Sequence, residues 1–390
     1  MRRLVGPALT VVAALGGALL AGCADVPARQ PATQEPETSS LPPRQPIPSW
    51  TAPAPPGPPT FTVVASGGVL IHPALTAQAQ SDGGGARDYR PLFAGVKQVV
   101  SSGDLAICNL EVPLATANGP FAGWPQFYSP PEVATALADT GYDECSTASN
   151  HTLDRGADGV RSTLDILDAA GIKHAGSARS PEEAAQPRIL EVKAGAKVGH
   201  VSFTFGFNGG PPPRNTPWLA NTLDVDAVLS AARAAKQAGA DVVIVSLHWG
   251  TEYRSEPTAQ QRELASRLLA DDAIDLIVGH HAHVVQPFEQ INGKWVAYGL
   301  GNHVARHAEP MGTTEEGVIG RFRFAKDAAG KWRVEHVEYV PTLVELGPPI
   351  RLVDLTAVPD GPRKAQALSR VDQVVRSRGA TPTELGGPGV

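Results

Sequence analysis

Four short runs that are almost wholly apolar constrain the fold of this chain most strongly. They cover residues 61–65, 105–108, 242–247 and 274–278. Such runs are typical of strands that are buried on both faces of a sheet. Segments with the apolar periodicity of helices lie between them. One of these is predicted to end at Gly171, because glycine is common just past a helix end. Strand and helix therefore alternate, which predicts an α/β fold with a mostly parallel sheet.

The second half of the chain is predicted to be richer in strands. Residues 285–300 and 318–340 each indicate a strand pair around a glycine-containing turn. A last helix carries apolar residues at helical spacing and ends near Gly379. We assign residues 61–350 to one large domain and residues 351–390 to a C-terminal helix and tail.

The N-terminus has the pattern of a lipoprotein signal. Two arginines precede an apolar or small stretch over residues 4–20, and Leu20-Ala21-Gly22-Cys23 follows. This predicts a signal peptide over residues 1–22 and lipidation of Cys23. Residues 23–60 are rich in Pro, Ala, Thr and Ser, which is typical of a semi-extended tether. We therefore expect an exported protein, lipid-anchored to the outer face of the cell membrane.

The net charge of the chain limits the classes of partner that it is expected to bind. The formal net charge is −6 and no dense basic run occurs, so no nucleic-acid partner is expected. The expected partners are the membrane, through the lipid anchor, and an anionic envelope polymer or phosphoester substrate. Such a substrate needs local positive charge or metal in its binding site.

Two cysteines remain besides Cys23. Cys108 and Cys145 lie near predicted strand ends, so they could face each other on neighbouring strands. The sequence leaves a disulfide and two buried thiols equally open.

Histidines follow two of the buried strands. Gly279-His280-His281-Ala282-His283 comes directly after residues 274–278, and His248-Trp249-Gly250-Thr251-Glu252-Tyr253 follows residues 242–247. Loops at the carboxyl ends of such strands face the ligand crevice. Neutral imidazoles are the usual protein ligands for zinc-like and manganese-like ions. These two loops therefore predict a metal site.

Two further strand ends carry polar side chains. Asn150 can ligate a metal through its amide oxygen, and the adjacent His151 can act as an acid or orient a leaving oxygen. Asp154 can hold the second nitrogen of His151. Asn109-Leu110-Glu111 ends another strand, where the carboxylate of Glu111 can bridge two cations.

With these loops in order, the chain resembles the CapA family of poly-γ-glutamate capsule biosynthesis proteins, a branch of the calcineurin-like metallophosphoesterase superfamily. The resemblance runs from about residue 61 to residue 340. It rests on Asn109-Leu110-Glu111, on Ser149-Asn150-His151 with Asp154 and Gly156, on residues 246–253, on residues 279–287 and on Tyr298-Gly299-Leu300-Gly301-Asn302.

The resemblance implies a four-layer αββα sandwich with one or two divalent ions, of which zinc, manganese and iron all suit mixed N/O ligands. It implies a metal-dependent hydrolase or transferase in the biosynthesis of a poly-γ-glutamate-type capsule or other cell-surface polymer. The implied metal ligands are Glu111, Asn150, His248, His281 and His283, and the implied catalytic pair is His151 with Asp154. Additional candidates at the site are His72, Asn109, Glu252, His280 and Asn302.

One departure from the family pattern concerns the first strand. The family usually has Gly-Asp there, with the aspartate as a metal ligand, but this chain has Gly67-Gly68. One metal position is therefore expected to be weakened, vacant, or completed by His72 or by water. The alternative function is a non-catalytic membrane-tethered scaffold or polymer-binding protein that keeps the metallophosphoesterase fold.

Overall fold

Apolar side chains point to both faces of the central strands. Each of the two sheets therefore packs against the other sheet on one face and against helices on the opposite face. A computed structural model describes residues 59–381 and 383–387, all of which belong to one compact unit. The predicted signal peptide, Cys23, and all but the last two residues of the predicted tether lie outside the described residues.

The first sheet has nine strands. Its order is β14-β13-β12-β1-β2-β3-β4, while β11 pairs with β1 and β15 pairs with β13. The strands are β1 (Thr60–Val69), β2 (Leu105–Leu110), β3 (Glu144–Ser146), β4 (Lys173–Ala175), β11 (Asn302–Val304), β12 (Glu316–Lys326), β13 (Trp332–Glu345), β14 (Arg351–Asp354) and β15 (Leu385–Gly386).

The second sheet has six strands in the order β5-β6-β7-β8-β10-β9. They are β5 (Arg188–Glu191), β6 (Lys197–Thr204), β7 (Val242–His248), β8 (Leu276–His280), β9 (Phe288–Ile291) and β10 (Lys294–Ala297). The helices are α1 (Pro73–Asp82), α2 (Arg90–Phe93), α3 (Lys97–Ser101), α4 (Glu132–Thr140), α5 (Gly156–Ala169), α6 (Pro181–Ala184), α7 (Val225–Gln237), α8 (Ala259–Leu269) and α9 (Pro362–Val375), with a 3-10 turn at Pro217–Leu219.

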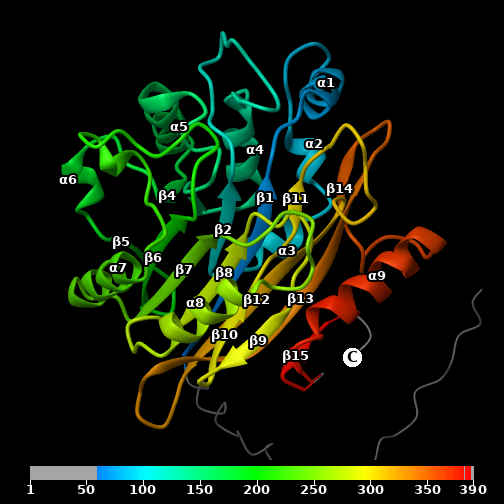
Figure 1. Cartoon of the computed structure of the whole chain (residues 1–390). Coiled ribbons are helices and arrows are strands. Elements are labelled where there is room, and N and C mark those ends of the chain that lie inside the picture. The colour runs from blue at the N-terminus through cyan, green and yellow to red at the C-terminus, as the bar shows by residue number, and fades with distance from the viewer. Residues whose placement is uncertain (1–58, 382, 388–390) are drawn as a thin grey trace, which may run out of the picture. The chain divides into compact units, whose positions relative to one another are not determined.

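The two sheets and the helices that flank them are drawn in Figure 1, and three apolar clusters lie between these layers. Val64 of β1 belongs to a cluster shared with α1 to α5, whereas its neighbours Val63 and Ala65 belong to a cluster between the two sheets. On β7, Ile244 joins that inter-sheet cluster and Val243 faces α7 and α8. The layers therefore run helix, sheet, sheet, helix, and the predicted αββα arrangement is confirmed.

The sequence predictions for the strand-rich half are largely confirmed. β9 and β10 form a hairpin around Asn292 and Gly293, which both have positive φ as a tight hairpin turn requires. β12 and β13 form the second predicted pair. The expectation of a mostly parallel sheet holds for β1 to β4 and for β6 to β8. Each sheet is nevertheless mixed, because β12 to β14 pair antiparallel in the first sheet and β5–β6 and β9–β10 pair antiparallel in the second.

The C-terminal segment joins the same unit. β14 extends the first sheet beside β13, and α9 packs on β12 and β13. Val371 and Val375 of α9 enter the inter-sheet cluster. Arg363 and Arg370 of α9 form ion pairs with the buried Glu316 at the start of β12. Among the described residues, no helix is both long enough and apolar enough to cross a membrane.

Cys108 and Cys145 form a disulfide. They are register partners on the parallel strands β2 and β3, with their Cα atoms 4.4 Å apart. This decides between the two states that the sequence left open. The bridge joins the two strands that lead into the loops carrying Glu111 and Asn150.

We expect the double variant Cys108→Ala/Cys145→Ala to have a free energy of unfolding lower than wild type by about 3–4 kcal/mol. The reason is that the bridge closes a loop of 37 residues and so restricts the unfolded chain. Chemical denaturation with and without a thiol reductant measures this. Reductant should lower the stability of the wild type and leave that of the double variant unchanged; equal responses would contradict the prediction.

Candidate functional site

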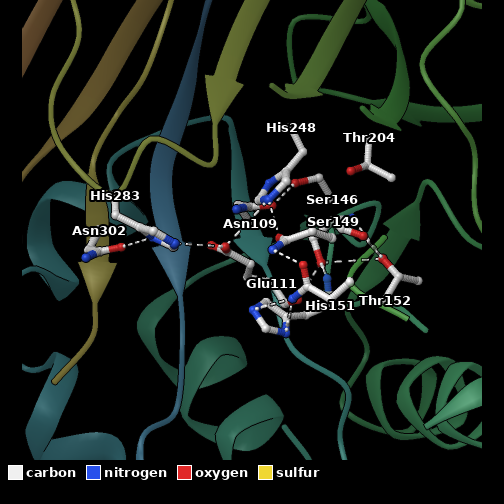
Figure 2. Close-up of polar contacts among 12 residues, drawn as sticks. Asn109, Glu111, Ser146, Ser149, His151, Thr152, Thr204, His248, His283 and Asn302 are labelled. Carbon is white, nitrogen blue, oxygen red and sulfur yellow. Dashed lines mark hydrogen bonds and ion pairs between the residues drawn. The ribbon is translucent and has the colours of Figure 1, made fainter. Parts of the chain in front are cut away.

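Polar side chains converge between the two sheets, where the carboxyl ends of β2, β7 and β8 meet the loop after β3 (Figure 2). Glu111 directly follows β2, His248 is the last residue of β7, and His281 directly follows β8. Asn150 lies in the loop between β3 and α5. The parallel pairing of β7 with β8 places their carboxyl ends side by side, with His248 opposite His280.

Glu111, His248 and His281 form the first of two candidate metal clusters. One ligand atom from each lies within 4.8 Å of the others, and all three residues are buried. Glu111 Oε1 lies 3.5 Å from His248 Nε2. The ring centroids of His248 and His281 are 4.8 Å apart. The first cluster therefore combines one carboxylate with two imidazoles.

Glu252, His281 and His283 form the second cluster, again with one atom of each residue within 4.8 Å of the others. His281 is common to both clusters. His283 Nε2 also lies 3.7 Å from Glu111 Oε1, so the two clusters adjoin. His283 Nδ1 lies 2.9 Å from Asn302 Oδ1. Because an amide oxygen only accepts hydrogen bonds, Nδ1 carries the proton and Nε2 presents its lone pair to the site.

The backbone is unusual at His281 and His283 and at Tyr253, which follows Glu252 in the chain. His281 has φ 88°, His283 has φ 56° and Tyr253 has φ 61°. Residues other than glycine rarely adopt this region, and such conformations concentrate at functional sites. In consequence the chain turns sharply after β8, and both His281 and His283 reach the site from a segment of three residues.

Asn150 and His151 extend the site on the side of α5. Asn150 Oδ1 lies 2.8 Å from His248 Nε2. His151 Nδ1 lies 2.7 Å from Asp154 Oδ2, which also accepts the backbone N–H of Phe127 at 2.8 Å. The contact between His151 and Asp154 is the one predicted from the sequence. It fixes the orientation of the imidazole, whose Nε2 lies 3.5 Å from Asn208 Nδ2.

Asn302 supports the ligand side chain of His283, and Asn109 is held by Ser146. Asn109 Oδ1 accepts a hydrogen bond from Ser146 Oγ at 2.9 Å. Asn302 Nδ2 donates to the Thr314 carbonyl at 2.9 Å while its Oδ1 holds His283. Neither residue belongs to the two clusters of His and acidic side chains. Their contacts fit a role in positioning.

His280 and His72 are not brought into either cluster. The loop begins two residues later than the apolar pattern indicates, because Gly279 and His280 continue β8 in register with β7. Burial, and then the nearby His200, lower the pKa of His280 to about 3. His72 Nδ1 lies 3.2 Å from the backbone N of Arg306 and 3.2 Å from the Leu70 carbonyl. That nitrogen is therefore occupied by backbone contacts.

Gly68 lies against the first cluster. It pairs with Asn109 on β2 and with Asn302 on β11. A Cβ atom at this position would collide with Glu111 Oε2 and with Leu70 Cδ1. The carboxylate of Glu111 therefore fills the space in which a side chain at position 68 would begin.

Burial dominates the electrostatics of the site. It raises the pKa of Glu111 to about 8, with a smaller contribution from Glu252. It lowers the pKa of His281 to about 4 and that of His283 to about 3, and it lowers the pKa of His248 well below its usual value. At neutral pH these imidazoles are uncharged, which is the form that binds metal.

The residues present fit a divalent metal. Glu111 Oε1 and His281 Nδ1 are buried, and neither has a hydrogen-bond partner among the described residues. Buried polar atoms normally have partners, and a cation would satisfy both. Two carboxylates with three neutral imidazoles make a mixed N/O donor set, which suits zinc, manganese or iron.

Two contributors to the site lie outside the predicted motifs. Asn208 donates its backbone N–H to the Asn150 carbonyl at 3.0 Å, and its side-chain Oδ1 accepts from Asn150 Nδ2 at 3.2 Å. The ring of Phe127 packs edge-on against His151 at 4.8 Å. Both residues come from irregular loops, and Asn208-Gly209-Gly210 has the composition of an ordinary turn. Nothing in the sequence pattern singles them out.

Comparison with known proteins gives a family match and several relatives. Residues 62–307, more than half of the chain, match the family model "Bacterial capsule synthesis protein PGA_cap". The chain is 29% identical over 208 residues to the PGA biosynthesis protein CapA of Bacillus subtilis, covering 53% of each chain. It is 31% identical over 176 residues to the capsule biosynthesis protein CapA of Bacillus anthracis, covering 44% of this chain and 42% of that one.

The chain thus spans about half the length of these relatives. Among solved structures, the calcineurin-like phosphoesterase YfkN from Bacillus subtilis aligns with 81% of this chain and 98% of that chain. The alignment has 14% identity and a TM-score of 0.40.

We expect Glu111→Gln to stabilise the metal-free protein increasingly as the pH rises from 5 to 9. The pKa of folded Glu111 is about 8, above the ordinary 4.5. Its protonated form therefore contributes stability that is present below pH 4.5 and is lost as the pH rises through 8. The difference between variant and wild type should grow by on the order of 4 kcal/mol. Denaturation in the presence of a chelator measures it, with the exposed Glu263→Gln as a flat control.

We also expect Gly68→Asp and Gly68→Asn to differ in a metal-dependent way. Either side chain must displace Glu111, but only aspartate adds a second ionisable carboxyl group beside it. Without metal, Gly68→Asp should be less stable than Gly68→Asn by at least about 1 kcal/mol. Excess Mn²⁺ should remove that difference, because a cation neutralises the paired carboxylates. Thermal melts of both variants with and without Mn²⁺ provide the measurement; identical behaviour would show that position 68 does not reach the metal cluster.

Proposed function

The chain belongs to the family of bacterial capsule synthesis proteins PGA_cap, and from that membership we propose that it is a metal-dependent hydrolase or transferase acting in the biosynthesis of a capsule or cell-surface polymer. The observation that carries the proposal is the pair of adjoining clusters that share His281. Glu111 Oε1 and His281 Nδ1, which have no hydrogen-bond partner among the described residues, and the uncharged imidazoles beside them form a donor set for divalent cations.

Glu111, His248 and His281 would hold one ion, with Asn150 beside them, and Glu252 and His283 would supply the remaining ligands. Such an ion polarises a phosphoryl or carbonyl oxygen and lowers the pKa of a bound water. His151 would exchange a proton with the substrate at Nε2, because Asp154 holds its Nδ1. Asn302 would keep His283 in the tautomer that presents Nε2 to the site.

The proposed location is the outer face of the cell membrane. It is supported by the signal pattern and by Cys23, which would carry the lipid anchor. The Pro-rich residues 23–60 would then act as a tether that holds the domain of residues 61–350 away from the bilayer. The proposed substrate is a polymer of the cell envelope, as the names of the relatives suggest.

One observation favours a second candidate function, that of a non-catalytic, membrane-tethered protein that binds the polymer. Position 68 carries no carboxylate, and Glu111 fills the adjoining space. The first strand therefore supplies no side-chain ligand near the clusters. A protein that binds a polymer without cleaving it would keep the fold and tolerate this loss.

We expect His281→Ala to abolish metal uptake by the full-length protein and to remove hydrolysis of a generic phosphodiester, because His281 belongs to both clusters. His280→Ala is the matched control, since His280 is adjacent in sequence and buried but belongs to neither cluster. Metal content by elemental analysis and turnover of bis-p-nitrophenyl phosphate measure the two effects.

The two candidate functions predict different metal uptake and turnover for the wild-type protein. Metal uptake with turnover supports the hydrolase, and metal uptake without turnover of the phosphodiester or of poly-γ-glutamate supports the polymer-binding protein. Absence of bound metal in the wild type, or equal uptake by His281→Ala, would contradict the proposal.

A further inference from the structure

A large open cavity lies directly beside the clusters. Its volume is about 1380 Å³, and Asn150, His151, Glu252 and His283 form part of its wall. Pockets for small molecules usually measure about 300–1,000 Å³. The cavity therefore has room for several linked residues of a polymer, with one of them at the metal clusters.

Two exposed aromatic side chains line this cavity, and a third lies against a residue of the metal clusters. The described residues expose five large apolar side chains, namely Phe121, Trp124, Phe205, Tyr253 and Met311. Trp124, 77% exposed, and Tyr253, 42% exposed, line the cavity itself. Phe205 contacts His281 with ring centroids 4.5 Å apart. Exposed apolar groups that cluster at one place mark a binding surface rather than ordinary scatter.

Trp124 and Tyr253 come from different parts of the chain. Trp124 belongs to the loop between β2 and α4, and Tyr253 belongs to the loop after β7. The ring of Tyr253 is braced by His283 and His307, at centroid distances of 5.9 and 6.2 Å. Two aromatic faces thus meet one cavity from separate segments.

The cavity has little positive charge. Among the described residues that line it, Arg306 is the single lysine or arginine, whereas Asp154, Glu252 and Glu309 carry carboxylates. The Arg306 guanidinium already donates to the carbonyl of His307. A polymer with one carboxylate on every residue would need several cations along its path. Bound metal would neutralise Glu252 and Glu111 but would add positive charge only at the clusters.

We propose that this cavity binds an uncharged sugar-polymer segment, with Trp124 and Tyr253 as stacking platforms for its rings. Sugar rings present C–H groups on their faces, and these pack against the electron-rich faces of aromatic rings. The side chains of Gln126 and Asn208, which also line the cavity, offer amide donors and acceptors to sugar hydroxyls. This inference rests on the proposed function for the position of the reacting bond, but the binding itself needs no turnover.

The test measures binding of uncharged hexasaccharides to the full-length protein by calorimetry and by tryptophan fluorescence. The probes are cellohexaose, chitohexaose and maltohexaose, each compared with a hexamer of γ-linked glutamate. At least one hexasaccharide should bind more tightly than the glutamate hexamer. Trp124→Ala should weaken that binding about tenfold, and Trp124→Phe should retain most of it.

Two control variants distinguish stacking on Trp124 from a general loss of exposed apolar surface and from a loss of metal. Met311→Ala removes an exposed apolar side chain that does not line the cavity and should leave affinity unchanged. His281→Ala should keep hexasaccharide binding even if it loses metal, so failure of the metal proposal and failure of this inference give different results. Tighter binding of the glutamate hexamer, no binding of any hexasaccharide, or equal losses in Trp124→Ala and Met311→Ala would each overturn the inference.

Discussion

Two sheets packed face to face must fill one shared layer with side chains from both inner faces, and the composition of that layer changes along the strands. On β7, Ile244 is apolar, but two residues later Ser246 is polar and the strand ends at His248. On β2, Ile107 gives way to Asn109 in the same manner. The apolar end holds the sheets together, and the polar end opens between them as the candidate site. The same packing that stabilises the fold therefore decides where metal ligands can gather.

Much of this arrangement could be predicted from the sequence, because strand burial and strand ends leave short-range patterns. Runs buried on both faces identified β1, β2, β7 and β8, and their carboxyl ends identified Glu111, His248, His281 and His283 as neighbours in space. The hairpin turns followed from their glycines. The antiparallel pairings of β12 with β1 and of β14 with β13 did not follow, because apolar periodicity gives no strand direction.

The finer geometry of the site depends on features that a linear pattern does not contain. His280 and His281 are adjacent, yet one ends β8 and the other has positive φ, so only His281 reaches the clusters. The sequence shows that position 68 lacks a carboxylate. It does not show that Gly68 lies against Glu111, because only tertiary packing brings these two residues together. Trp124, Phe127 and Asn208 lie in loops without periodicity, and only the tertiary structure brings them to one cavity.

Because His281 belongs to both clusters, an ion bound at one cluster would affect ion binding at the other. A ring nitrogen coordinates one cation at a time, and both ligand sets draw on this one imidazole. If both sets bound ions, filling one would change the free energy of filling the other, and the effect would be reciprocal by thermodynamic linkage. Two ions that competed for the same nitrogen of His281 would bind anticooperatively, and the second would have fewer ligands or the remaining nitrogen of the same ring.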